Sequence, residues 1–378
     1  MKILFTGGGS GGHFYPIIAV AQAVHTRAKE RRILAPTLHY MAPSKYNPRA
    51  LFENDIEFIA VPAGKIRRYF SLLNVTDLFK TFVGCIMAVI KMYSLYPDIV
   101  FGKGGYASFP PLLAARILRI PVIIHESDSR PGRVNLWASK FARKIAISYP
   151  DAAKYFTKTS PDKIAHTGNP VRSDIIPALS NGALEILKLE QHTPVVVILG
   201  GSQGSQTIND VILQALPELL NRYQVIHQTG RANLEEIQAT SAVLLKDHPY
   251  SYRYHPMDYL NDLNLRMAAG VALVIVSRAG STLFEIAAWG VPSIIIPLPH
   301  SVSHDQTDNA FSYARTGAAS IVQENNLSAH IIIGEIDRIH DNEVLQKTMR
   351  EQAKAFARID SSALIADALL DTALEHEK

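Results

Sequence analysis

The sequence has little cysteine and little excess of either charge. Cys85 is the one cysteine in 378 residues, which excludes a disulfide framework and a cysteine-ligated metal cluster. The 38 basic and 34 acidic residues give a net charge of +4, whereas a dedicated nucleic-acid binder concentrates positive charge. Glycines interrupt the first apolar run after five residues, so we expect no secretory signal. These features predict a cytoplasmic protein that does not bind nucleic acid.

Long hydrophobic runs are also missing. Asp77 and Lys80 interrupt the most apolar stretch, residues 65–90, and residues 82–90 fall short of the roughly 20 residues that cross a bilayer. Residues 66–79 mix basic with large apolar side chains, which is typical of a segment lying on an anionic membrane surface; an internal helix is the alternative. For residues 82–90 we expect an internal helix packed on a sheet.

What the chain does contain is a repeated alternation of strand-length and helix-length segments, which predicts parallel sheets covered by helices. Expected strands lie at residues 2–5, 38–41, 56–61, 99–101, 122–125 and 144–148, and again at 195–199, 224–228, 252–254, 273–276, 293–297 and 319–322. The pattern predicts an α/β protein of two Rossmann-like doubly wound domains facing a central cleft. Turn residues cluster at 163–172, so we expect domains at 1–166 and 167–345 and a helical segment, 346–378, that returns to the first domain.

A glycine-rich loop follows the first strand of each half. Residues 7–12 hold five glycines, and residues 200–205 repeat the device before a helix starting near Gln206. Such loops present backbone N–H groups and a helix dipole to phosphate. The first loop also matches a dinucleotide fingerprint, but the next strand ends in Ala42-Pro43-Ser44 without the acidic residue that a nicotinamide cofactor requires. Two loops at strand ends instead predict a cleft for a phosphorylated donor and its acceptor.

Seven segments, in order along nearly the whole chain, resemble the MurG family of peptidoglycan N-acetylglucosaminyltransferases. They are residues 7–16, 102–106, 125–126, 168–172, 200–204, 277–280 with 285–288, and 305–306 with 309–310. The resemblance implies a GT-B fold and inverting transfer of GlcNAc from UDP-GlcNAc to the C4 hydroxyl of undecaprenyl-pyrophosphoryl-MurNAc-pentapeptide. It also implies a peripheral location on the inner face of the membrane, with other cell-wall synthesis proteins as further partners.

The donor site that follows from this resemblance uses the second glycine loop for the UDP diphosphate, Glu285 for the ribose and Gln306 for the sugar. Its expected residues are Ser10, Gly11, Gly12, Arg172, Gly201, Ser202, Gln203, Gly204, Met257, Arg278, Gly280, Ser281, Glu285 and Gln306. The alternatives are an ordinary tight turn for the loop, helix-charge compensation for Glu285 and a solvated loop for Gln306. The sequence has no Asp-x-Asp pair, so no cofactor is required and a divalent cation is not implied.

The acceptor site and the catalytic base are expected near the first glycine loop. His13 is the candidate base, since imidazole titrates in the useful range, and Glu126 and Asp128 compete with it or orient it; a structural histidine is the alternative. The expected acceptor residues are Gly9, His13, Lys103, Gly104, Gly105, Tyr106, His125 and Asp128. The family has His-Glu-Gln-Asn where this chain has His125-Glu126-Ser127-Asp128, so Asp128 replaces an amide with an acceptor that cannot donate when ionised.

Other functions stay open, and Asp128 is the feature that keeps the first of them open. A related transferase could use another lipid or small-molecule acceptor, a UDP-sugar epimerase or hydrolase would turn over donor without acceptor, and a nucleotide-sugar-binding module would not turn it over.

Overall fold

The computed structural model describes residues 1–65, 73–201, 204–299 and 306–376 and divides the chain into two compact units. Unit 1 comprises Met1–Arg172 and Arg358–Lys378, and unit 2 comprises Ser173–Ala357. The two units meet at 172/173 and 357/358. Our expected boundaries, at 166/167 and 345/346, lie a few residues before the first junction and twelve residues before the second. The predicted turn-rich segment 163–172 lies in unit 1.

Unit 1 is a parallel seven-stranded sheet of order β3-β2-β1-β4-β5-β6-β7. Its strands are β1 (Lys2–Thr6), β2 (Thr37–Ala42), β3 (Ile56–Ala60), β4 (Ile99–Gly102), β5 (Val122–Glu126), β6 (Lys144–Ile147) and β7 (Ile164–His166). Its helices are α1 (Gly11–Glu30), α2 (Pro48–Glu53), α3 (Leu73–Leu95), α4 (Phe109–Leu118), α5 (Arg133–Ala138) and α14 (Ser361–His376).

Unit 2 is a parallel six-stranded sheet of order β10-β9-β8-β11-β12-β13. Its strands are β8 (Val195–Leu199), β9 (Gln224–Gln228), β10 (Tyr254–Met257), β11 (Ala272–Ser277), β12 (Ser293–Ile295) and β13 (Ala319–Ile321). Its helices are α6 (Ala183–Ile186), α7 (Gln206–Leu219), α8 (Leu234–Leu244), α9 (Asp262–Val271), α10 (Thr282–Trp289), α11 (Gln306–Ala314), α12 (Ala329–His340) and α13 (Glu343–Phe356). Two doubly wound sheets were therefore correctly predicted.

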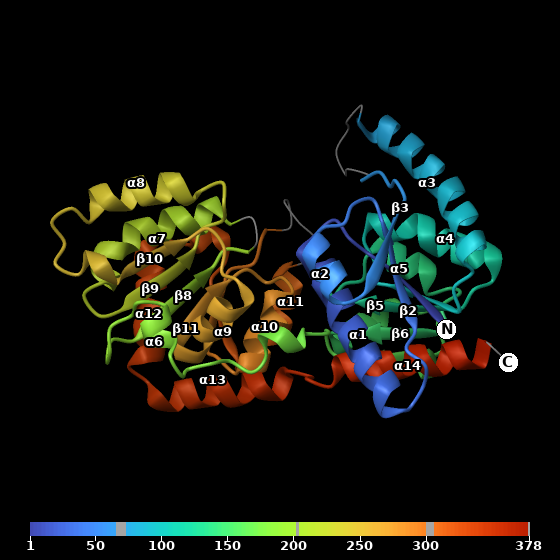
Figure 1. Ribbon diagram of the computed structural model, residues 1–378. Helices are drawn as coiled ribbons and strands as arrows, with labels where there is room; N and C mark the ends of the chain where they lie inside the picture. The colour runs from blue at the N-terminus through green and yellow to red at the C-terminus, as the bar shows by residue number, and fades with distance from the viewer. Residues whose placement is uncertain (66–72, 202–203, 300–305, 377–378) are drawn as a thin grey trace. The chain divides into compact units, whose positions relative to one another are not determined.

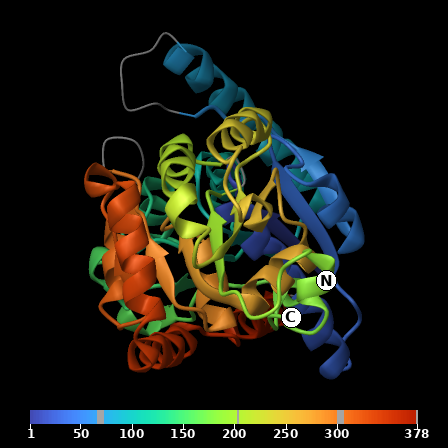
Figure 2. The same cartoon turned by 90° about the vertical axis from the view of Figure 1, so that its left-hand side faces the viewer.

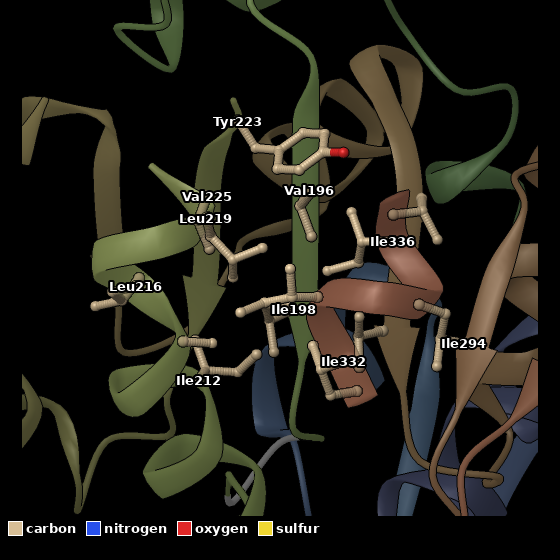
Figure 3. Packing of buried hydrophobic residues seen from close by; sticks show 14 of the residues in the cluster. Val196, Ile198, Ile212, Leu216, Leu219, Tyr223, Val225, Ile294, Ile332 and Ile336 are labelled. Carbon is tan, nitrogen blue, oxygen red and sulfur yellow. The ribbon is translucent and has the colours of Figure 1, made fainter. Parts of the chain in front are cut away.

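Apolar side chains on both faces of each sheet make the cores, as expected when helices cover both faces of parallel strands. In unit 2, Val196 and Ile198 of β8 pack against Ile212 and Leu216 of α7 and against Ile336 of α12 (Figure 3). These residues are essentially inaccessible to solvent. The packing fixes the start of α7 beside the end of β8, where the second glycine loop lies.

Helix α3 differs from our expectation for residues 82–90. Figures 1 and 2 show α3 at the outer edge of unit 1, where it packs on α4. Phe82, Ile86 and Ile90 are 49–63% exposed, so the expectation of an internal helix is wrong. One side of the helix does pack inward, through Ala88 and Met92, and this leaves the opposite apolar side uncovered.

Candidate active site

The first glycine loop joins β1 to α1 and requires glycine for steric reasons. Gly9 has φ +94°, and a Cβ there would lie 2.7 Å from the Tyr106 ring. Tyr40 donates a hydrogen bond from Oη to the Gly7 carbonyl oxygen at 2.5 Å. The loop bearing Gly104, Gly105 and Tyr106 therefore packs directly on the loop bearing Ser10, Gly11 and Gly12, and both lie at the carboxyl ends of strands.

His13 in the first turn of α1 has a defined tautomer. Its Nδ1 lies 3.2 Å from the carbonyl oxygen of Lys103, which can only accept, so Nδ1 carries the proton and Nε2 keeps a lone pair. Burial and then the Lys103 ammonium lower the pKa of His13, while Asp128 opposes the shift. A neutral imidazole with a free Nε2 lone pair can accept a proton.

Glu126 ends β5 and its carboxylate holds the following loop. It accepts hydrogen bonds from the Asp128 and Gly132 backbone N–H groups, both at 3.0 Å, and from Asn135 Nδ2 at 2.9 Å. Glu126 is buried, and burial raises its pKa. These contacts are those of a residue that shapes the loop carrying Asp128. Our sequence analysis missed Asn135, whose position in a short helix gave no signal.

The side-chain contacts of Lys103 lie within unit 1. Its side chain is completely buried, and Nζ contacts His125 Nδ1 at 2.7 Å, Asn169 Oδ1 at 3.1 Å and Ser127 Oγ. His125 is also buried and donates from Nε2 to the Gly168 carbonyl oxygen at 3.0 Å. The polar atoms of these two side chains thus bind one another and unit 1 backbone, and their expected contact with the acceptor stays a prediction.

Arg172 ends the first segment of unit 1 and is 8% exposed. Its guanidinium carbon lies 4.4 Å from the centre of the Tyr15 ring, a cation–π contact. Arg172 is thus fixed beside the start of α1. Its expected contact with the donor diphosphate stays a prediction.

The second glycine loop follows β8, and α7 begins at Gln206, where the sequence predicted it. Ser202 and Gln203 lie outside the described residues. Gly201 and Gly204 have φ values of +89° and +76°, and a Cβ at Gly204 would lie 1.9 Å from the Thr229 carbonyl oxygen. Glycine is therefore needed at 204 for space as well as for backbone conformation.

Arg278 connects this loop to the segments that follow β12 and β13. It follows β11, donates to Ser205 Oγ at 2.6 Å and to the Ile296 carbonyl oxygen at 3.2 Å, and pairs with Glu324 at 2.5 Å. The side chains of Arg278 and Glu324 are 11% and 20% exposed. Sequence analysis missed Glu324, because it lies 46 positions from Arg278 and no motif contains it.

The other expected donor residues also follow strands of unit 2. Glu285 is half-buried in the first turn of α10, which begins just after Ser281, and a Cβ at Gly280 would meet open space. Gln306 opens α11 and accepts a hydrogen bond from Leu298 N at 3.3 Å. Asp305, which we expected in the same polar loop, lies outside the described residues.

Met257 ends β10, which begins two residues later than predicted. The Met257 carbonyl oxygen accepts hydrogen bonds from Thr229 N at 2.9 Å and Thr229 Oγ1 at 3.1 Å. The expected contact of Met257 with the donor stays a prediction. Among the described side chains, no group of three or more His, Cys, Asp or Glu residues is placed to hold a metal ion.

The exposed side of α3 carries a continuous apolar stripe. Its residues are Val75, Leu78, Phe79, Phe82, Ile86, Ile90 and Tyr93, which are 49–70% exposed and follow helical spacing. By length and composition alone, Val75–Leu95 could cross a membrane, which our count of uninterrupted apolar residues did not predict. Residues 66–72, including the expected lipid-binding Arg67 and Arg68, lie outside the described residues.

Comparisons with known proteins match both units. The glycosyltransferase family 28 N-terminal domain matches residues 3–147, and the glycosyltransferase family 28 C-terminal domain matches residues 195–363. The UDP-N-acetylglucosamine–N-acetylmuramyl-(pentapeptide) pyrophosphoryl-undecaprenol N-acetylglucosamine transferase of Treponema denticola is 35% identical, covering 97% of this chain and 96% of that protein. A Bacillus cereus transferase of the same description, numbered 2, is 33% identical over 92% of this chain and 94% of its own length.

Solved structures give the same architecture. The crystal structure of Acinetobacter baumannii MurG matches with a TM-score of 0.71 and 25% identity, covering 98% of this chain and 99% of that one. A UDP-GlcNAc 2-epimerase from Neisseria meningitidis matches with a TM-score of 0.67 at 16% identity, covering 98% and 100%. At that identity the epimerase shows a shared fold alone.

Proposed function

The chain belongs to the MurG family within glycosyltransferase family 28, and on this premise we propose that it transfers GlcNAc from UDP-GlcNAc to lipid-linked MurNAc-pentapeptide in peptidoglycan synthesis. The observation that carries the proposal is the 35% identity along 97% of the chain to a transferase of that description. The two glycine loops at the ends of β1 and β8 support it, because the reaction needs binding groups for two phosphorylated substrates.

The reaction is an inverting displacement. The C4 hydroxyl of MurNAc attacks the anomeric carbon of GlcNAc, its proton passes to His13 Nε2, and the bond from the anomeric carbon to the UDP oxygen breaks with its electron pair. The tautomer held by Lys103 supports His13 as base. Asp128, the one nearby charge that raises the pKa of His13, stabilises the imidazolium that forms.

The charge that develops on UDP is stabilised by the second glycine loop. Backbone N–H groups of residues 201–205, the Ser202 hydroxyl and the α7 dipole perform this task, together with Arg172. Arg278 supports the loop through Ser205. Glu285 binds the ribose hydroxyls, and Gln306 binds the sugar.

The protein works as a peripheral protein on the inner face of the membrane, where a lipid-linked acceptor is found. The α3 stripe enters the interface, with Lys65 and Lys80 near anionic lipid. Packing of α3 on α4, and the contact of Lys91 Nζ with the Ala60 carbonyl oxygen at 2.9 Å, favour surface contact over crossing.

Transfer of labelled sugar from UDP-GlcNAc to a short-chain undecaprenyl-pyrophosphoryl-MurNAc-pentapeptide analogue tests the function. UDP-Glc and UDP-GalNAc serve as competitors, and a reaction without acceptor is the control. We expect acceptor-dependent transfer that is selective for UDP-GlcNAc. Donor turnover without acceptor would indicate an epimerase or hydrolase, and donor binding without product would indicate a different acceptor.

A further inference from the structure

The completely buried side-chain amine of Lys103 joins three segments of unit 1, and burial lowers its pKa to about 7, so that it becomes an ammonium as the pH falls below that value. Its Nζ contacts His125 at the end of β5, Ser127 in the following loop and Asn169 after β7. Because His125 Nε2 donates to the Gly168 carbonyl oxygen, His125 Nδ1 is the acceptor for Lys103. Burying an ammonium is costly unless it is hydrogen-bonded, and here three side chains provide those bonds.

The backbone of Lys103 is fixed as firmly as its side chain. Lys103 N donates to the Thr6 carbonyl oxygen at 2.8 Å, and a Cβ at Gly7 would lie 2.8 Å from Lys103 Cβ. The end of β4 therefore lies directly against the end of β1. From this position the Lys103 carbonyl oxygen accepts a hydrogen bond from His13 Nδ1.

Several titratable groups surround His13. Lys103 lies on the β4 side, Asp128 and His125 act from the β5 side, and Tyr106 packs on Gly9 of the loop that carries His13. The Lys103 ammonium disfavours a proton on His13, and Asp128 favours one. Burial of His13 strengthens both effects, because charges interact more strongly away from water.

We propose that Lys103 is a positioning residue for transfer, which aims the His13 ring through its backbone carbonyl and keeps that ring uncharged through its buried ammonium. This proposal rests on the proposed function, in which His13 is the base. The chemical requirement is simple, since an imidazole that already carries a proton cannot take one from the acceptor hydroxyl. Lys103 would thus extend activity to lower pH.

The test compares Lys103→Met with Lys140→Met, a change of an exposed lysine in the same unit. The Lys103 variant keeps the carbonyl and removes the charge. NMR of histidine-labelled protein, with the His13 signal assigned from its loss in His13→Gln, measures the pKa of His13 without substrate. The pH dependence of kcat/KM for GlcNAc transfer is measured in parallel.

We expect Lys103→Met to raise the pKa of His13 by about one unit and to move the acid limb of kcat/KM by the same amount, with no shift in Lys140→Met. Activity reduced equally at every pH, with the His13 pKa unchanged, would reveal a structural role and overturn the proposal. If the acid limb stays while the NMR titration moves, His13 is not the base and the proposal also fails. Absence of transfer in the unmodified protein would instead refute the proposed function.

A second variant, Asp128→Asn, tests the proposal even if Lys103→Met does not fold. Removing the charge that opposes Lys103 should lower the pKa of His13, the opposite direction from Lys103→Met. An unchanged His13 titration in Asp128→Asn would mean that neighbouring charges do not control this ring, and the proposal would be wrong.

Discussion

At the scale of single residues, His13 has the contacts of a general base, since one nitrogen is committed to a carbonyl and the other is free to accept a proton. His13→Ala should lower kcat by about 10²–10⁴-fold and leave UDP-GlcNAc affinity unchanged. Single-turnover transfer and calorimetric donor titration measure the two quantities. His25→Ala is the matched control, because His25 lies on the same helix and contacts the Asn54 carbonyl oxygen. Full activity in His13→Ala would exclude the base role.

The pH dependence of the unmodified protein follows from the same ring. Burial and Lys103 lower the pKa of His13 below 6.5, so His13 stays neutral at pH 7 and its protonation reduces kcat/KM as the pH drops through that lowered value. A profile that falls at or above pH 6.5 on its acid side would contradict this assignment.

Glu285 distinguishes donor binding from helix stabilisation. A carboxylate that accepts two ribose hydroxyls contributes charged hydrogen bonds, so Glu285→Ala should weaken UDP-GlcNAc binding by roughly 10–100-fold. Isothermal titration measures the affinity. Glu343→Ala is the control, because Glu343 is an exposed carboxylate in the first turn of α13. Equal affinities in both variants would favour helix-charge compensation at Glu285.

Sequence motifs predicted where the glycine loops lie better than they predicted what the neighbouring side chains contact. Lys103 shows why. Its buried side chain contacts Ser127 and Asn169, which lie 24 and 66 positions away in the sequence, so no local motif reveals these contacts. Glu324 was missed for the same reason. Glycine positions were more predictable, because a residue such as Gly204 has a positive φ that glycine adopts readily, and this requirement is local in the sequence.

At the scale of elements, the apolar side of α3 predicts membrane binding. Replacing Leu78 and Phe82 together by serine should remove most binding to vesicles that contain anionic lipid, while the unfolding midpoint stays unchanged because both side chains are exposed. Vesicle co-sedimentation and thermal unfolding measure these effects. Phe52→Ser, at an 84% exposed site on α2, is the control. Undiminished vesicle binding would show that α3 does not contact lipid.

Most strands could be predicted, and the exceptions have physical causes. β7 has three residues and is partly exposed at the sheet edge, so its apolar signal is weak. β10 includes Pro256, which lowers strand propensity, and begins at Tyr254 after a short turn of 3₁₀ helix. Residues 82–90 of α3 were assigned to the interior because apolar composition does not distinguish a buried face from an exposed one.

At the scale of the whole molecule, the last helix belongs to the core of unit 1. Ile365, Leu369 and Leu370 of α14 are buried in the same cluster as Phe5 and Ile17. Two surface ion pairs, both at 2.6 Å, join α14 to α1. They are Arg27–Asp367 and Arg31–Asp371, and Arg31 is the residue that follows the last turn of α1. Apolar burial stabilises this packing more than the ion pairs do, because each of the three large side chains contributes about 1.5–3 kcal/mol while an exposed ion pair contributes up to about 1 kcal/mol.

Removing residues 358–378 should therefore destabilise unit 1 selectively, by an amount comparable with the roughly 5–15 kcal/mol that stabilises a whole domain. The two tryptophans separate the units, since Trp137 lies in α5 of unit 1 and Trp289 in α10 of unit 2. Urea unfolding of Trp137→Phe and Trp289→Phe, each with and without the deletion, measures each unit through its remaining tryptophan. We expect the Trp137 midpoint to fall and the Trp289 midpoint to stay, whereas Asp371→Asn changes the stability of neither unit by more than about 1 kcal/mol. A joint fall of both midpoints would mean that the two units unfold as one cooperative body, and α14 would then stabilise the molecule beyond the unit on which it packs.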